Sequence, residues 1–253
     1  MVIVRRALVL VLVVGCGRFG FGTPATGDAL GDDGGADIGD SPAPPSGLIV
    51  WFQFDNDNGT TFTDSISGLQ GTCGAPGCPT LTTAGHRNSA YVFDGSNDCI
   101  SIPDAPQLQQ ATFTIAAWGS QRSSALITRM SKQFAAQNNS WQLGSSLNDS
   151  AYFLYNAGTN DIGLPNVPNS IVLNTFQHVA ATFDASSLIE VYVNGARVIT
   201  DVPAGPIAYD ANQAAIGCTA HASPSAFFDG TLDEIQIYNR VLTAAEIMQL
   251  AQQ

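Results

Sequence analysis

The chain has 253 residues and a formal net charge of −12 at pH 7, from 21 acidic and 9 basic side chains. This excess of acid argues against nucleic-acid binding, because a binder neutralises phosphates with Lys and Arg. Charged residues make up only 12% of the chain, and the acids are 18 Asp against 3 Glu. Since Asp, Asn, Gly, Ser and Thr favour turns and disfavour helix interiors, the composition indicates strands and loops.

The first fifteen residues have the pattern of an export signal. Arg5 and Arg6 precede the apolar run Ala7–Gly15, which is too short for a membrane span of about 20 residues. The run ends in Val13-Val14-Gly15-Cys16, which resembles the lipobox of bacterial lipoproteins. The resemblance implies that residues 1–15 are a signal peptide cleaved before Cys16, whose thiol then carries a lipid. An ordinary secretory signal that contains a Cys is the alternative.

The lipidated Cys16 and the segment up to residue 47 are expected to form a tether. Residues 17–47 are rich in Gly, Asp, Pro, Ala and Ser, a composition that predicts disorder. In enterobacterial lipoproteins, an Asp directly after the lipidated Cys resembles a signal for retention in the inner membrane. This chain has Gly17 at that position, so we expect the protein at the outer membrane or cell surface. The only membrane contact expected is the lipid anchor.

From residue 48 onward the sequence is typical of an all-β domain. Short apolar or alternating runs predict about a dozen strands, at 48–54, 90–93, 99–102, 113–118, 125–130, 141–143, 151–155, 176–183, 188–193, 196–200, 214–217 and 232–238. Asn194-Gly195 predicts a tight hairpin, because both central residues need positive φ. Thr243 and Glu246 form a capping box that predicts one helix over 243–250.

An ordered set of these segments carries a family resemblance. The set includes Leu48–Asp55 (LIVWFQFD), Tyr91–Ile102 (YVFDGSNDCISI), Val191–Gly195 (VYVNG) and Phe228–Ile247 (FDGTLDEIQIYNRVLTAAEI). It resembles the laminin-G-like domains of the concanavalin A-like lectin/glucanase superfamily, over residues 48–253. The resemblance implies a two-sheet antiparallel jelly-roll sandwich, here with a short C-terminal helix. One departure is Phe176, where the family usually has Trp.

Four cysteines follow the expected anchor, namely Cys73, Cys78, Cys99 and Cys218. An even number in an oxidising compartment predicts disulfides, with three possible pairings. Cys73 and Cys78 bracket a Gly- and Pro-containing turn, whereas Cys99 and Cys218 lie on strands that can be neighbours. We favour the pairs 73–78 and 99–218. A zinc site is the alternative, but no CxxC or paired His accompanies the cysteines.

Catalytic motifs are missing from the sequence. The superfamily's glucanases use a Glu-x-Asp-x-x-Glu strand, which a chain with Glu only at 190, 234 and 246 cannot form. Asp233 and Glu234 are adjacent, so strand alternation predicts that they face opposite sides and cannot flank one glycosidic bond. We expect one of them to pair with Arg240 or to bind backbone amides. His178 is expected to be structural.

A calcium site is one candidate for ligand binding. Asp94, Asn97 and Asp98 lie on one tight turn, and Asp233 is a candidate fourth ligand; hard oxygen ligands suit Ca²⁺. The alternative is that these side chains only bind backbone amides of the turn. The stretch Asp55–Gly59 (DNDNG) resembles a calcium loop, but its ligands are out of frame with an EF-hand.

An aromatic platform for a sugar ring is the other candidate. The rings available are Trp141, Tyr152, Tyr155 and Tyr209. Aromatic residues in strands are more often buried than exposed. Trp51 and Trp118 lie within apolar runs and are expected in the core.

The sequence therefore favours a cell-envelope lipoprotein with a non-catalytic binding domain for carbohydrate, with Ca²⁺ as a candidate cofactor. An adhesion or structural module that binds an envelope or extracellular protein is the first alternative. A polysaccharide-degrading enzyme with two Asp side chains across a cleft is the second.

Overall fold

The computed structural model describes residues 43–253. The expected signal peptide, Cys16 and the tether up to residue 42 lie outside the described residues. No helix in the described part is both long enough and apolar enough to cross a lipid bilayer.

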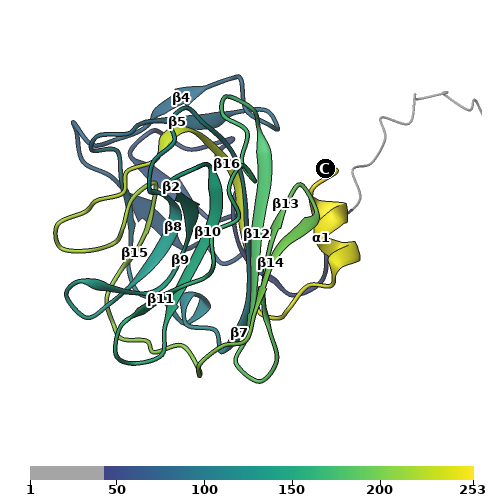
Figure 1. Ribbon diagram of the computed structural model, residues 1–253. Helices are drawn as coiled ribbons and strands as arrows, with labels where there is room; N and C mark the ends of the chain where they lie inside the picture. Colours follow the sequence, from purple (N-terminus) through teal and green to yellow (C-terminus); the bar gives the residue numbers. More distant parts are fainter. Residues whose placement is uncertain (1–42) are drawn as a thin grey trace, which may run out of the picture. The chain divides into compact units, whose positions relative to one another are not determined.

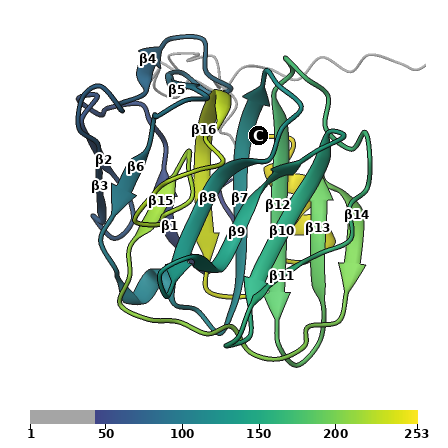
Figure 2. The same cartoon turned by 60° about the vertical axis from the view of Figure 1, so that its left-hand side comes forward.

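Two antiparallel sheets face each other across one core (Figures 1 and 2). The first has the order β14 (Ala196–Asp201), β13 (Ile189–Val193), β12 (Gln177–Asp184), β7 (Thr112–Gln121), β16 (Asp229–Tyr238), β5 (Ala90–Asp94), β4 (Thr80–Thr82), and β1 (Leu48–Phe52) also pairs with β16. The second has the order β11 (Asp161–Gly163), β10 (Ser150–Asn156), β9 (Asn138–Ser146), β8 (Ile127–Phe134), β15 (Ala214–Ile216), β6 (Ile100–Ile102), β3 (Gln70–Thr72), β2 (Thr61–Thr63). We call these sheets A and B. The expected jelly-roll sandwich is confirmed.

Alternation along the strands separates the core from the outer face of sheet A. On β7, Ile115 and Ala117 belong to the main core between the sheets, whereas Ala116 belongs to a second apolar cluster. That second cluster contains Ile247 and Leu250 of helix α1 (Ala244–Leu250). The helix therefore covers part of the outer face of sheet A, as Figure 1 also shows.

Two local predictions are confirmed in detail. Asn194 and Gly195 have φ values of 49° and 79° and close the hairpin in which Val193 pairs with Ala196. Helix α1 begins at Thr243, whose side chain accepts a hydrogen bond from the amide of Glu246, while the Glu246 carboxylate accepts one from the amide of Thr243. A short side-chain motif sets the boundary in each case.

The strand β16 has three partners. It pairs with β7 along most of its length, with β5 through Asp229–Leu232 and with β1 through Ile235–Tyr238. A register shift between Asp233 and Gln236 marks the point where β1 replaces β5 as the second neighbour of β16. Residues near the two ends of the domain thus form the centre of one sheet.

Several strand predictions need correction. The strand predicted over 48–54 ends at Phe52, because Phe54 has a left-handed backbone with φ of 63°. Four strands of three residues each were not predicted: β2, β3, β4 and β11. Trp118 is buried as expected, but it does not belong to the cluster between the sheets, and Trp51 is only half-buried. Trp118 sits on the outer face of sheet A, stacked on His86 at 3.4 Å between ring centroids.

The favoured disulfide pairing is confirmed. Cys73 is bonded to Cys78 within one loop, and Cys99 is bonded to Cys218 across a sequence separation of 119. The second bridge links the segment before β6 to the segment after β15, which are neighbouring strands in sheet B.

The one lysine of the chain, Lys132, is fully buried at the end of β8. Its ammonium donates hydrogen bonds to the carbonyls of Asp210, at 3.0 Å, and Asn212. The carboxylate of Asp104 lies 3.4 Å from the same nitrogen. Because a buried charge needs such partners, Lys132 holds the segment before β15 against sheet B.

Phe62→Ala should lower the free energy of unfolding by about 3–5 kcal/mol, because Phe62 is completely buried and the change leaves a cavity. Urea denaturation followed by fluorescence would measure the loss. Leu81→Ala is the control, since Leu81 is half exposed and its truncation should change little. Equal losses in both variants would contradict the assigned core.

Candidate functional site

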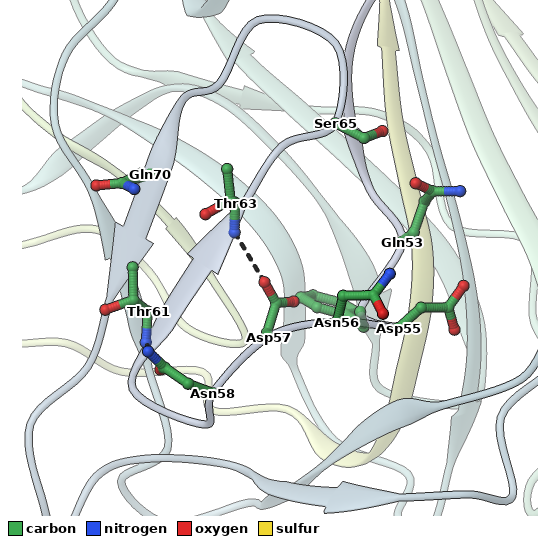
Figure 3. A pocket seen from close by; sticks show the side chains of 10 residues that line it. Gln53, Asp55, Asn56, Asp57, Asn58, Thr61, Thr63, Ser65 and Gln70 are labelled. Atoms are coloured by element: carbon green, nitrogen blue, oxygen red, sulfur yellow. Dashed lines mark hydrogen bonds between the residues drawn. The ribbon is translucent and has the colours of Figure 1, made fainter.

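A polar cavity of about 350 Å³ opens beside the loop that follows β1. Ten residues line it, and Figure 3 shows their side chains as sticks: Gln53, Phe54, Asp55, Asn56, Asp57, Asn58, Thr61, Thr63, Ser65 and Gln70. They come from the loop 53–58, from β2 and the turn after it, and from the start of β3. We call it the polar cavity.

Aromatic packing anchors the loop beneath the polar cavity. The Phe54 side chain is buried and makes edge contacts with Phe62 and Tyr91, at 6.0 and 5.5 Å between ring centroids. Such pairs add about 0.5–1.5 kcal/mol to the burial of their apolar area. The packing of the Phe54 ring offsets the strain of its left-handed backbone. The polar residues that follow Phe54 remain at the surface.

Hydrogen bonds hold the polar residues of this loop in place. One Asp57 carboxylate oxygen accepts from the amide of Thr63 at 2.9 Å. The Asn58 side-chain oxygen accepts from the amides of Thr60 and Thr61, at 3.0 and 2.8 Å. The wall of the cavity is therefore preformed.

Asp55 is fixed from the opposite side of the loop. Its two carboxylate oxygens accept from the amide of Ser89 at 3.0 Å and from the side chain of Asn88 at 3.2 Å. Both partners belong to the segment before β5, which thus fixes the position of Asp55.

The buried carboxylate of Asp64 supports the turn behind the cavity. It accepts from the amide of Trp51 on β1 at 2.6 Å, and from the amides of Ile66, Ser67 and Leu69. A carboxylate with this many N–H donors is well compensated for its burial. The turn between β2 and β3 is therefore held against β1.

The charge of the polar cavity is negative. Two carboxylates line it and no basic side chain does. Burial raises the pKa of Asp57, and the nearby charge of Asp55 adds to this, while the hydrogen bond from the amide of Thr63 opposes it. The other lining groups are amides and hydroxyls, which can both donate and accept hydrogen bonds.

The residues predicted to hold calcium form a hydrogen-bonded turn. One Asp94 oxygen accepts from the amides of Ser96 and Asn97, at 2.8 and 3.1 Å, and Asp98 accepts from the amide of Asp94 at 2.8 Å. Asp233 does not join them, because Asp94 pairs with Asp229, four residues away on β16. Residues 43–253 contain no group of three or more His, Cys, Asp or Glu arranged to hold a metal ion.

Two of the four predicted platform rings are buried, which corrects that expectation. Trp141 and Tyr155 are 2% and 1% exposed. The indole N–H of Trp141 donates to the carbonyl of Leu108, and the Tyr155 hydroxyl accepts from the amide of Ala204. Tyr152 and Tyr209 are partly exposed, but neither lines the polar cavity.

Asp233 and Glu234 lie on the same face, contrary to the prediction from strand alternation. Glu234 has φ of 51° within the register shift of β16, and such a bulge places two consecutive side chains on one side. Asp233 accepts from the amide of Arg87 at 3.0 Å, and Glu234 accepts from the indole N–H of Trp51 at 2.6 Å. Arg240 pairs instead with Glu246.

Burial governs the ionisation of this acid pair. It raises the pKa of both carboxyl groups to about 7, and the charge of Glu234 contributes to the rise at Asp233. The adjoining hollow measures only about 10 Å³, which is room for about one water molecule. Such a space cannot admit a sugar, so we assign the pair a structural role. His178, which lines the same hollow, is buried as expected.

The sequence patterns do not predict the polar cavity. The DNDNG stretch resembles a calcium loop only out of frame, and the strands β2 and β3 that complete the cavity have only three residues each. The available signal was the dense run of Asn, Asp, Thr, Ser and Gln between residues 53 and 70.

A family model described as the concanavalin A-like lectin/glucanases superfamily matches residues 94–248. A comparison with curated protein sequences gives no significant match. Domain 4 of AbnA, a GH43 extracellular arabinanase from Geobacillus stearothermophilus solved in complex with arabinotriose, has a TM-score of 0.62 at 20% identity, over 81% of this chain and 98% of that one.

The binding domain of botulinum neurotoxin DC is a second kind of structural neighbour. Its complex with SialylT gives a TM-score of 0.58 at 16% identity, covering 82% of this chain and 51% of that one. Its complex with rat synaptotagmin II gives a TM-score of 0.59 at 15% identity, covering 81% of this chain and 51% of that one. This chain thus spans nearly all of the arabinanase domain but about half of the toxin domain, and the likeness is one of fold.

The free energy of unfolding should fall as the pH rises from about 4 to about 7, because the native state holds protons on Asp233 and Glu234 that the unfolded state has released. The expected loss is on the order of 3 kcal/mol for each carboxyl. Urea denaturation at several pH values would measure it.

Asp233→Asn should flatten this dependence and stabilise the domain above pH 7, because the amide keeps the shape without the charge. Asp201→Asn, which removes a partly exposed carboxylate from β14, is the control and should leave the slope unchanged. An unchanged slope in Asp233→Asn would refute the assignment.

Proposed function

This chain belongs to the concanavalin A-like lectin/glucanases superfamily, and from that premise we propose that residues 48–253 form a non-catalytic carbohydrate-binding domain. A lipid on Cys16 and the tether after it would display the domain on the outer membrane or cell surface. The single observation that carries the binding proposal is the preformed polar cavity.

The chemistry of the polar cavity matches that of a sugar. Sugar hydroxyls donate and accept hydrogen bonds, and the lining supplies carboxamides from Gln53, Asn56 and Gln70 together with hydroxyls from Thr61 and Thr63. A volume of about 350 Å³ lies at the lower end of the range for small-molecule sites. Because the loop is already fixed by hydrogen bonds, binding requires little ordering of the wall.

The neighbours support the same class of ligand. The arabinanase domain was solved with arabinotriose and the toxin domain with SialylT. The toxin domain was also solved with rat synaptotagmin II, which makes a protein partner the second candidate. Carbohydrate is the first candidate, since the polar cavity has the size and polarity of a small-molecule site.

We propose calcium binding separately. The turn that carries Asp94, Asn97 and Asp98 would supply the oxygen ligands. A chelator tests it directly. Binding that survives EDTA would remove calcium from the proposal and leave the polar cavity as the binding site.

A glycan array with the purified chain, run with Ca²⁺ and again with EDTA, should identify a bound carbohydrate. Gln70→Ala should then weaken that binding about tenfold, because it removes one amide that hydrogen-bonds the ligand, while the unfolding midpoint stays the same. Asn160→Ala, an exposed amide next to β11 at the opposite edge of sheet B, should bind as the unaltered chain does.

Three outcomes would contradict this proposal. Equal affinity in Gln70→Ala and Asn160→Ala would place binding elsewhere. No binding to any glycan would favour the protein partner. Release of new reducing ends from a bound polysaccharide, abolished by Asp57→Asn, would show an enzyme.

Cys16→Ala should abolish the incorporation of labelled palmitate and shift the protein out of the membrane fraction, because the thiol that accepts the lipid is removed. Gly17→Ala is the control and should keep both properties. Membrane association without label in the unaltered chain would contradict lipidation.

A further inference from the structure

We propose that the polar cavity selects a sugar with a protonated primary amine over the neutral N-acetylated form of the same sugar and over acidic sugars. The inference rests on the proposed function and adds the chemical class of the ligand. It is carried by the charge and hydrogen bonding of Asp55 and Asp57.

The charge of the cavity is not neutralised by its own wall. The lining has two carboxylates and no base, and none of the ion pairs among residues 43–253 involves either carboxylate. Arg87, on the segment next to Asn88, lines the small hollow beside Glu234 instead. An acidic sugar would bring a third negative charge to the site, whereas an ammonium group would bring the missing positive one.

Asp57 offers the open acceptor. One of its oxygens accepts from the amide of Thr63, as the dashed line in Figure 3 shows, and its other oxygen makes no hydrogen bond within the described residues. Both oxygens of Asp55 are already used by Ser89 and Asn88. Asp55 thus adds negative charge, and Asp57 adds both charge and a direct hydrogen bond.

The partial burial of Asp57 makes a cation more favourable at this site. Removal of water raises the pKa of the carboxyl, which means that the charged form lacks compensation there. A bound ammonium would place a compensating positive charge directly beside the Asp57 carboxylate. A charge-assisted hydrogen bond is about twice as strong as a neutral one.

An ammonium fits the donors and acceptors better than a bare metal ion does. Calcium takes about 6–8 oxygen ligands, but the Asn58 oxygen already accepts three hydrogen bonds, from Thr60 and Thr61. An ammonium has three N–H donors, which Asp57 and two carboxamide or hydroxyl oxygens of the wall can satisfy.

Titration calorimetry of the full chain with three trisaccharides would test the inference. Chitotriose with free amines and its N-acetylated form have the same backbone and differ only at the nitrogen, and trigalacturonic acid is the acidic probe. We expect the free-amine form to bind about three- to tenfold more tightly than the acetylated form at low salt, with a smaller ratio at high salt. Trigalacturonic acid should bind most weakly.

Two variants separate the carboxylate from the rest of the cavity. Asp57→Asn should reduce the preference to less than about twofold while the acetylated trisaccharide still binds, since only the charge is lost. Asp201→Asn changes the net charge by the same amount on β14 and should keep the preference.

The remaining outcomes each overturn a defined claim. Equal affinity for the amine and acetylated forms in the unaltered chain, or tighter binding of trigalacturonic acid, would overturn the inference and leave the proposed function intact. No binding of these probes and none on the glycan array would overturn the proposed function, and the inference with it. A third result would show that the polar cavity binds a metal ion and not an ammonium group. In that case the unaltered chain would bind calcium, Asp57→Asn would not, and the free-amine trisaccharide would not compete with calcium.

Discussion

The structure depends on the pairing of β1 with the distant strand β16. Without β1, the half of β16 beyond the bulge would lack its second neighbour, because β5 covers only Asp229–Leu232. The change of neighbour coincides with the register shift that brings Asp233 and Glu234 to one face. The same pairing fixes the point from which the loop 53–58 leaves the sheet, and so it positions the polar cavity.

Local sequence patterns predicted the architecture but not this consequence. The hairpin at Asn194-Gly195 and the capping box at Thr243 each depend on a few neighbouring residues, and both are found as predicted. The bulge at Asp233 has no such local cause, since it follows from the exchange of β5 for β1. Strand alternation alone therefore gave the wrong faces for the acid pair.

The candidate site shows the same limit of local patterns. Phe54 looks like the end of an apolar strand, and only its packing against Phe62 and Tyr91 reveals that the backbone turns there. The short strands β2 and β3 form because the turn between them is held by Asp64, which also binds the amide of Trp51. The aromatic candidates Trp141 and Tyr155 were misplaced for a related reason, since a buried ring and a sugar platform have the same sequence signal.

The position of Lys132 has a practical consequence for chemical studies of the domain. Its ammonium is enclosed by backbone carbonyls and by Asp104, so the native domain presents no lysine side chain to reagents that acylate amines. Cross-linkers and dyes of that kind will modify the α-amino group when it is free, and Lys132 only after the segment around Asp210 and Asn212 has opened. Acylation of this residue is therefore a direct reporter of local opening beside β8 and β15.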